Sequence, residues 1–284
     1  MSTFMGLRIG EPSELTASDR TVFEYSAQLG QFFRQVASAP RRLLLLDYDG
    51  TLAPFNVDPT DAKPYDGIRE AIDDIIGGGA SQVALITGRP ARELLPLLGL
   101  RHRPEIWGLD GWERLLPDGE YRCGPFDAAA VRAVVQNTSW IEDAQRIGGR
   151  VEQKPCGVAI HWRGLTADKI NDIRRRITRQ WEALQPERRL QWEEIDGGVE
   201  WRLPGRDKGY IVRTLLQEHS DPVVAYLGDD LADEDAFRVL RGRGMSILVR
   251  PERRPTLADL WLRPPEQLLE FLTRWRVYCH GGCV

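Results

Sequence analysis

Apolar and polar positions follow a strand–helix rhythm over the first part of the chain. Four consecutive leucines at 43–46 predict a strand that is buried on both faces, as in the middle of a parallel sheet. Stretches with apolar residues at helical spacing alternate with further short buried strands. The expected elements are a helix over 19–37, strands over 43–46, 83–86 and 106–109, and helices over 65–76 and 91–98. This rhythm favours an α/β fold with a Rossmann-like, open, mostly parallel sheet.

The pattern changes near residue 123 and the first pattern returns near residue 205. In between, alternating strands are typical of a half-exposed antiparallel sheet. The expected elements there are helices over 126–140 and 166–184 and strands over 151–154, 157–163, 190–193 and 199–203. Beyond them we expect a helix from Lys208, strands over 223–227 and 245–249, and a helix over 266–275. The predicted domains are a core of 1–123 and 205–284, with a helical extension at 1–40, and an inserted α+β cap at 124–204.

Charge and hydropathy narrow the class of protein. The chain has 38 basic and 42 acidic residues and a net charge of −4, which argues against non-specific binding to nucleic acid. A run of about eighteen apolar residues, as a transmembrane helix requires, does not occur, so we expect no membrane partner. Residues 1–12 are polar, without the apolar centre of a signal peptide, and a cytoplasmic location is expected. The oligomeric state is left open.

Polar side chains lie where core strands end or core helices begin. They are Asp47 and Asp49; Thr87, Gly88 and Arg89; Lys208; and Asp229, Asp230 and Asp233. Considered singly, each cluster has a simpler explanation, because helix caps, solvated lysines and acidic first turns are common. Two carboxylates that converge at a sheet edge repel each other, however, and the lysine or a metal ion would relieve this repulsion. Together the clusters therefore predict one site.

The chemistry of this predicted site is phosphoryl transfer. Asp47 and Asp229 could bind Mg²⁺ through carboxylate oxygens, while Lys208 and Thr87 supply a positive charge and a hydroxyl donor for a phosphate. Asp47 could attack phosphorus and form an aspartyl-phosphate. Asp49 could protonate the leaving alcohol and then activate the hydrolytic water. Asp49 is also expected to bind the metal ion, through its backbone carbonyl.

The motifs and their order resemble the four motifs of the haloacid-dehalogenase superfamily. Within it, residues 47–54 and 228–235 are similar to the motifs of trehalose-6-phosphate phosphatases. That family also has Glu-x-Lys, His-x-Arg and a later Glu in its cap, and the matching residues here are Glu152, Lys154, His161, Arg163 and Glu200. The resemblance implies magnesium-dependent removal of phosphate from a phosphorylated disaccharide. It implies that these cap residues, together with Arg89, bind the substrate, and that Gly88, Asp230 and Asp233 support the site.

Three residues depart from the family pattern, and alternative functions stay open. Ala232 stands where the family usually has Thr, and Asp110 and Trp112 stand where it usually has His or Tyr and a smaller residue. If this segment faces the sugar, the substrate could be a related glycoside, such as a phosphorylated glucosylglycerol, glucosylglycerate or sucrose. A further alternative is an inactive sugar-phosphate sensor, or a regulatory domain associated with a sugar-phosphate synthase. Without the resemblance, Glu152 and Lys154 would be interpreted as a cross-strand ion pair.

Overall fold

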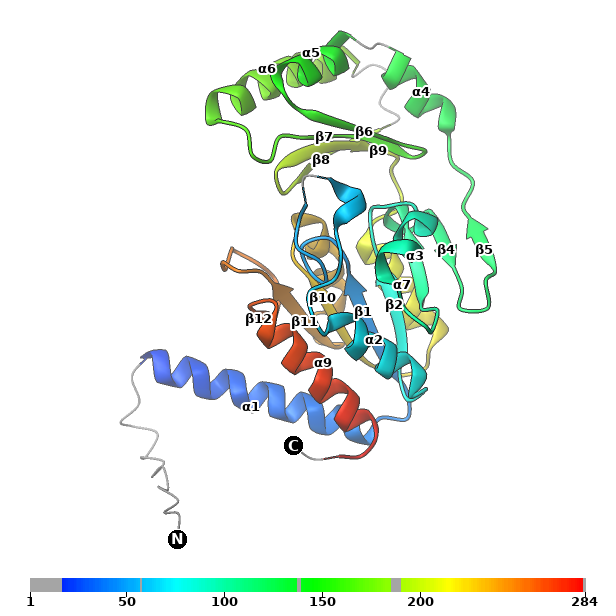
Figure 1. Ribbon diagram of the computed structural model, residues 1–284, viewed down its shortest axis with the longest axis vertical. Coiled ribbons are helices and arrows are strands. Elements are labelled where there is room, and N and C mark those ends of the chain that lie inside the picture. Colours follow the sequence, from blue (N-terminus) through cyan, green and yellow to red (C-terminus); the bar gives the residue numbers. More distant parts are fainter. Residues whose placement is uncertain (1–16, 57, 137–138, 185–189, 283–284) are drawn as a thin grey trace.

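The protein consists of a large sheet with flanking helices and a smaller sheet stacked on one end of it (Figure 1). The computed structural model describes residues 17–56, 58–136, 139–184 and 190–282. The large sheet has eight strands in the order β12-β11-β10-β1-β2-β3-β4-β5, parallel except at β3–β4 and β4–β5. Its strands are β1 (Arg42–Asp47), β2 (Gln82–Ile86), β3 (Glu105–Gly108), β4 (Glu113–Leu115), β5 (Tyr121–Cys123), β10 (Val223–Gly228), β11 (Met245–Val249) and β12 (Leu260–Leu262). The predicted fold class is confirmed.

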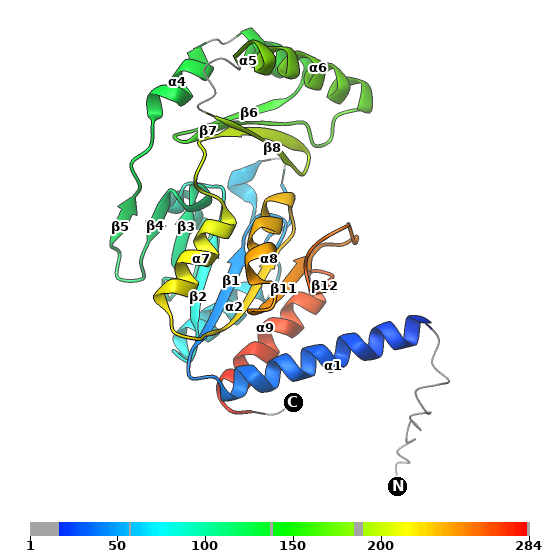
Figure 2. The same cartoon turned by 180° about the vertical axis from the view of Figure 1, so that it is seen from behind.

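The four leucines of β1 explain how the sheet is covered on both faces. Leu44 and Leu46 pack with buried residues of one set of helices, and Leu43 and Leu45 pack with those of the other, because successive side chains of a strand point to opposite faces. The first set is α1 (Ala17–Ser38), α2 (Ile68–Gly77), α3 (Ala91–Leu98) and α9 (Glu266–Cys279). The second set is α7 (Lys208–Glu218) and α8 (Glu234–Leu240), best seen in Figure 2.

The predicted N-terminal helix is α1, which lies beside α9 at the end of the core opposite the small sheet (Figure 1). Phe33 and Val36 on α1 are fully buried, and the Phe33 ring stacks on Tyr278 with ring centroids 5.0 Å apart. The helix therefore closes the apolar surface at the bottom of the core.

The smaller sheet and its helices, residues 128–202, are called the cap below. Four antiparallel strands have the order β6-β7-β9-β8, and three helices cover one face of them. These elements are β6 (Arg150–Lys154), β7 (Gly157–His161), β8 (Gln191–Ile195), β9 (Gly198–Arg202), α4 (Ala128–Gln136), α5 (Ser139–Ile147) and α6 (Ala167–Leu184). The buried residues Trp140, Ile173 and Ile177 join helices and sheet in one apolar cluster. The other face of the sheet is turned toward the core.

One predicted element of the cap is wrong. The single helix expected over 126–140 is two helices, because α4 ends at Gln136 and α5 begins at Ser139. Ser139, the first residue of α5, is a residue type that favours the start of a helix over its interior, and residues 137–138 lie outside the described residues. Four short core elements, β4, β5, β12 and α8, were not predicted, since a strand of three residues and a helix of seven are each too short to show their period.

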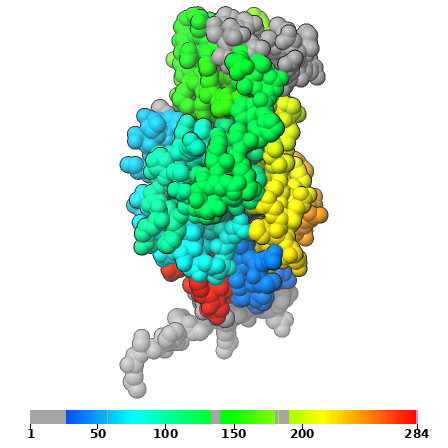
Figure 3. Space-filling model, turned by 90° about the vertical axis from the view of Figure 1, so that its right-hand side faces the viewer, coloured from blue at the N-terminus to red at the C-terminus, as the bar shows by residue number. Residues whose placement is uncertain are grey.

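The cap sits over the carboxyl ends of the parallel core strands, and Figure 3 shows the two parts in contact. This edge is where ligands bind in open α/β sheets. None of the helices that the structure describes is long and apolar enough to cross a membrane.

Candidate active site

Three carboxylates converge at the carboxyl edge of the core sheet. β1 and β10 are parallel neighbours, with Leu46 opposite Leu227, so Asp47 and Asp229 emerge from the same edge. Asp233 joins them from the short 3-10 helix η4 (Leu231–Asp233). One oxygen from each of these three carboxylates lies within 4.8 Å of the others, and all three residues are buried. From the sequence alone, Asp233 is expected only to support the site.

Lys208 neutralises part of this charge. It is the first residue of α7, whose N-cap is Asp207, and its Nζ lies 2.7 Å from Asp47 Oδ1 and 2.7 Å from Asp233 Oδ1. Burial opposes the charged amine, but Asp233 and Asp47 outweigh it and raise the pKa of Lys208 well above its ordinary value. Burial also raises the pKa of Asp47 to about 7, although Lys208 acts in the opposite direction.

The cluster fits a hard divalent cation. Thr51 donates a hydrogen bond of 2.9 Å to Asp47 Oδ2, whereas the buried Asp229 Oδ2 has no hydrogen-bond partner among the described residues. Burial and the neighbouring Asp47 raise the pKa of Asp229 well above its ordinary value. Leaving a buried carboxylate oxygen without a hydrogen-bond donor costs free energy. Mg²⁺ binds oxygen ligands of this kind, usually one or two carboxylates together with phosphate oxygens of the substrate.

Arg89 holds the second carboxylate of the motif. Its Nε and Nη2 each lie 2.6 Å from an oxygen of Asp49, in a two-pronged ion pair, and its Nη1 donates to the Pro59 carbonyl. The buried Thr87 hydroxyl accepts a hydrogen bond from the Arg89 backbone N–H and so fixes the turn after β2. Asp49 is thus paired with Arg89 rather than with the carboxylate cluster, and both residues line the cleft.

Strand register arranges the charged residues of the cap sheet in rows on the face toward the core. One row contains Lys154, Gly157 and Arg202, and the next contains Glu152, Ala159, Glu200 and Glu193. Gly157 and Ala159 on the central strands carry little or no side chain, and a Cβ on Gly157 would lie 2.5 Å from the Trp201 carbonyl oxygen. The sheet therefore forms a hollowed polar roof over the core.

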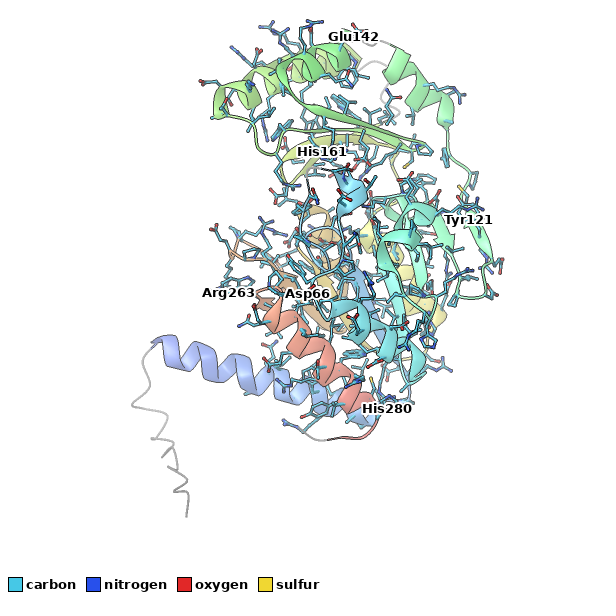
Figure 4. All side chains as sticks on the ribbon, viewed as in Figure 1. Asp66, Tyr121, Glu142, His161, Arg263 and His280 are labelled. Carbon is cyan, nitrogen blue, oxygen red and sulfur yellow. The ribbon has the colours of Figure 1, made fainter. Side chains whose placement is uncertain are left out.

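Glu152 and Lys154 do not form an ion pair with each other, as their sequence positions alone would suggest. Each pairs with another residue of the cap sheet. Glu152 accepts from His161 at 2.9 Å, and Lys154 Nζ lies 3.0 Å from Glu200 Oε1. Burial opposes ionisation of Glu152, yet His161 and Lys154 lower its pKa to about 2. Figure 4 shows His161 on the side of the cap sheet that faces the core. Burial opposes the charge on Lys154 as well, but Glu200 and Glu152 raise its pKa.

Core and cap enclose a cleft of about 550 Å³. The predicted residues that line it are Asp47, Asp49, Thr87, Gly88, Arg89, Glu152, Lys154, His161, Arg163, Glu200, Lys208 and Asp230. Asp229 and Asp233 lie beneath its floor, where Asp233 accepts from the backbone N–H groups of Asp229 and Asp230. Arg163 stacks on the ring of Phe55, with 3.6 Å from the guanidinium carbon to the ring centroid.

Several residues of the cleft were not predicted, among them Phe55, Glu193, Asp196, Arg202 and Asp235. Arg202 had a signal in the sequence, because it lies two residues after Glu200 on the same strand and so faces the same side. Of the two residues that depart from the family pattern, Asp110 lines the cleft, whereas Trp112 packs against Phe126, with ring centroids 5.8 Å apart.

Comparisons with known proteins agree with this geometry. The family model described as Trehalose-phosphatase matches residues 45–264. The trehalose-phosphate phosphatase of Mycobacterium marinum is 30% identical over 249 residues, which are 84% of this chain and 62% of that protein. The protein of the same name from Mycobacterium tuberculosis is 32% identical over 247 residues, 81% of this chain and 60% of that protein. The chain thus spans about 60% of the length of these curated relatives.

Solved structures show the same fold. The C-terminal domain of C. albicans trehalose-6-phosphate phosphatase has a TM-score of 0.77 at 23% identity, covering 87% of this chain and 96% of that one. The trehalose-6-phosphate phosphatase of Aspergillus fumigatus has a TM-score of 0.61 at 24% identity, covering 87% and 97%. The chain therefore shares the fold of these proteins.

Proposed function

Because the chain belongs to the trehalose-phosphatase family, we propose that it hydrolyses a sugar phosphate, most simply trehalose 6-phosphate, to the free sugar and inorganic phosphate. The observation that carries the proposal is the position of Asp47. Its carboxylate lines the cleft and lies 2.7 Å from the buried ammonium group of Lys208. An anionic nucleophile beside a fixed positive charge is what attack on a phosphate ester needs.

In the proposed mechanism, Asp47 attacks phosphorus, and the bond from phosphorus to the sugar oxygen breaks. Lys208 and the Thr87 hydroxyl stabilise the charge on the phosphoryl oxygens. Asp49 gives the proton to the leaving sugar oxygen and later takes one from the water that hydrolyses the aspartyl-phosphate. For this role Asp49 must leave Arg89, and the substrate phosphate competes for the same guanidinium group.

The proposed cofactor is Mg²⁺, which would neutralise charge on the phosphate. The residues that would hold it are the carboxylates of Asp47 and Asp229 and the backbone carbonyl of Asp49. The donor-free Asp229 Oδ2 supports this assignment, as does the convergence with Asp233. Asp233 would act mainly by fixing Lys208 and the turn after β10.

The proposed sugar contacts are Glu152, Lys154, His161, Arg163 and Glu200. A hydroxyl-rich ligand needs donors and acceptors on several sides, and these side chains supply both within one polar roof. The two separate sheets support the proposed division into a core of 1–123 and 205–284 and a cap domain of 124–204. A cytoplasmic location and association with a sugar-phosphate synthase stay predictions from the sequence.

The test is phosphate release from a panel of sugar phosphates in the presence of Mg²⁺. We expect turnover of trehalose 6-phosphate, and we expect Asp47→Asn to lower kcat by about 10³-fold or more while circular dichroism shows an unchanged fold. Preferred turnover of a glucosylglycerol, glucosylglycerate or sucrose phosphate would support the second candidate, which the presence of Asp110 in the cleft favours. Binding of sugar phosphates without turnover would support the inactive sensor instead.

A further inference from the structure

A carboxylate of the core and a guanidinium group of the cap face each other in the cleft. Asp110 follows β3 in the core, and Arg202 ends β9 in the cap. Both line the cleft, and both are only 7% exposed. Arg202 Nη1 lies 3.9 Å from Asp110 Oδ2, which is about 1 Å beyond the usual length of a charge-assisted hydrogen bond.

Arg202 is surrounded by carboxylates but bonds none of them closely. Its Nη2 lies 3.4 Å from Glu193 Oε1 and 3.9 Å from Asp235 Oδ2, and its buried Nε has no acceptor among the described residues. A buried guanidinium group without hydrogen bonds is costly, because the desolvation of its N–H groups is not offset. Arg202 Nη1, which faces Asp110, also has no acceptor within hydrogen-bonding distance among the described residues, and a ligand in the cleft can supply one.

Asp110 is held in a strained backbone conformation. Its φ is +51° and that of the preceding Leu109 is +50°, and only Asp221 shares a positive φ among the other non-glycine residues that the structure describes. The Asp110 backbone N–H donates to the Thr87 carbonyl at 3.2 Å, so the turn is tied to the loop beside the nucleophile. Strain of this kind is maintained where a side chain must be aimed at a particular point.

We propose that Asp110 and Arg202 together bind one hydroxyl group of the substrate sugar and so determine which sugar phosphate is accepted; this rests on the proposed function. An oxygen about 2.8 Å from both atoms bridges their 3.9 Å separation, donating its proton to Asp110 and accepting from Arg202. A hydroxyl group can do both at once, whereas a phosphate oxygen cannot donate to Asp110.

The position of Asp110 and Arg202 in the cleft indicates which ring of the sugar they bind. A Cβ placed on Gly88 would lie 3.5 Å from Asp110 Oδ2 and 3.3 Å from Lys154 Nζ. Gly88 directly follows Thr87, a proposed phosphate donor, so Asp110 lies close to the phosphate end of the cleft. The bound hydroxyl therefore belongs to the ring that carries the phosphate.

The experiment compares kcat/KM for trehalose 6-phosphate with kcat/KM for 4-nitrophenyl phosphate, which has no sugar hydroxyl. In Asp110→Asn and in Arg202→Gln we expect the ratio of the two constants to fall about 10- to 100-fold, the range for one hydrogen bond to a charged group. In the double variant we expect less than the product of the two losses, because both residues bind the same hydroxyl. Arg175→Gln, on the outer helix α6, removes an arginine from the cap outside the cleft and should keep the wild-type ratio.

The outcomes separate this proposal from the proposed function. If the wild type prefers a sugar phosphate but both single variants keep its ratio, or lose both activities alike together with a lower Tm, the pair is structural and the proposal is overturned. If the wild type hydrolyses 4-nitrophenyl phosphate and no sugar phosphate of the panel, the proposed function itself fails and this inference fails with it.

Discussion

The carboxylates of the cleft differ from one another because their neighbours differ. Asp47 is buried, and its pKa is raised to about 7, whereas Glu152 is surrounded by His161, Lys154 and Arg150, and its pKa is lowered to about 2. Asp47 lies beside other carboxylates and needs a nearby cation to stay ionised. Glu152 is ionised at neutral pH, and its charge is expected to stabilise the folded cap.

The Glu152 shift predicts a pH dependence of stability. Its pKa in the folded protein, about 2, is below the ordinary value of 4.5, so ionised Glu152 stabilises the fold fully above pH 4.5 and loses this effect as the pH falls toward 2. We expect Glu152→Gln to lower the free energy of unfolding at pH 7 by up to about 3 kcal/mol. Denaturant titrations from pH 7 to pH 3 should show this difference shrinking.

A matched control for this prediction is Glu142→Gln, at an exposed site on the outer side of the cap (Figure 4). It should change the free energy of unfolding by no more than about 0.5 kcal/mol at either pH. A difference between wild type and Glu152→Gln that stays constant from pH 7 to pH 3 would contradict the ionic origin of the effect.

At the scale of single residues, the sequence predicted the groups that follow a strand or begin a helix, such as Asp47, Thr87 and Lys208. Their spacing along the chain already implied a common edge. The pairing of Asp110 with Arg202 could not be predicted in this way. It depends on how the cap packs on the core, and 92 residues separate the two along the chain, so no local pattern connects them.

Among the elements, the turn after β1 is built around a glycine. Gly50 has φ +90°, and a Cβ there would lie 2.2 Å from Asp229 Oδ2. We expect Gly50→Ala to push Asp229 away from Asp47 and to lower kcat/KM at least about 100-fold, the effect of a displacement of about 1 Å at a reacting centre. Phosphate release at saturating Mg²⁺ measures it.

Gly79→Ala is the control that separates the effect of this contact from the effect of backbone strain. Gly79 also has a positive φ, +67°, but a Cβ there meets nothing within 4 Å among the described residues. Both variants carry a strain of about 1 kcal/mol, and only Gly50→Ala disturbs the site. Equal activity of the two variants would show that the approach to Asp229 is unimportant.

Helices and strands were predicted correctly where a segment is apolar throughout, and they were missed where contacts with other parts of the chain determine the structure. The leucines of β1 and the apolar run of β11 are unambiguous because each strand is covered on both faces. β4 forms by pairing with β3 and β5 by pairing with β4 at the edge of the sheet, and a strand of three residues has no detectable period.

On the scale of the whole molecule, the turn between β8 and β9 connects the cap to the core. Between β8 and β9, the Asp196 backbone N–H donates to Asp230 Oδ1 at 2.8 Å, and Asp196 Oδ2 lies 3.0 Å from Arg250 Nη1. Stacking of Arg163 on Phe55 adds a second contact between cap and core. Asp230 also caps η4, beside the carboxylate cluster, so these contacts join the cap to the core next to the nucleophile.

Removing the Arg250 contact should favour the open cap. A half-exposed ion pair contributes about 0.5–1 kcal/mol, which corresponds to a two- to fivefold change in the ratio of closed to open molecules. In Arg250→Ala we therefore expect a larger radius of gyration of the free protein by small-angle X-ray scattering and a KM raised by at most about fivefold, because substrate binding must then also close the cap. Arg253→Ala, an exposed arginine on the same loop, changes the net charge equally and should alter neither quantity. If both variants behave alike, the contact between Arg250 and Asp196 does not set the position of the cap.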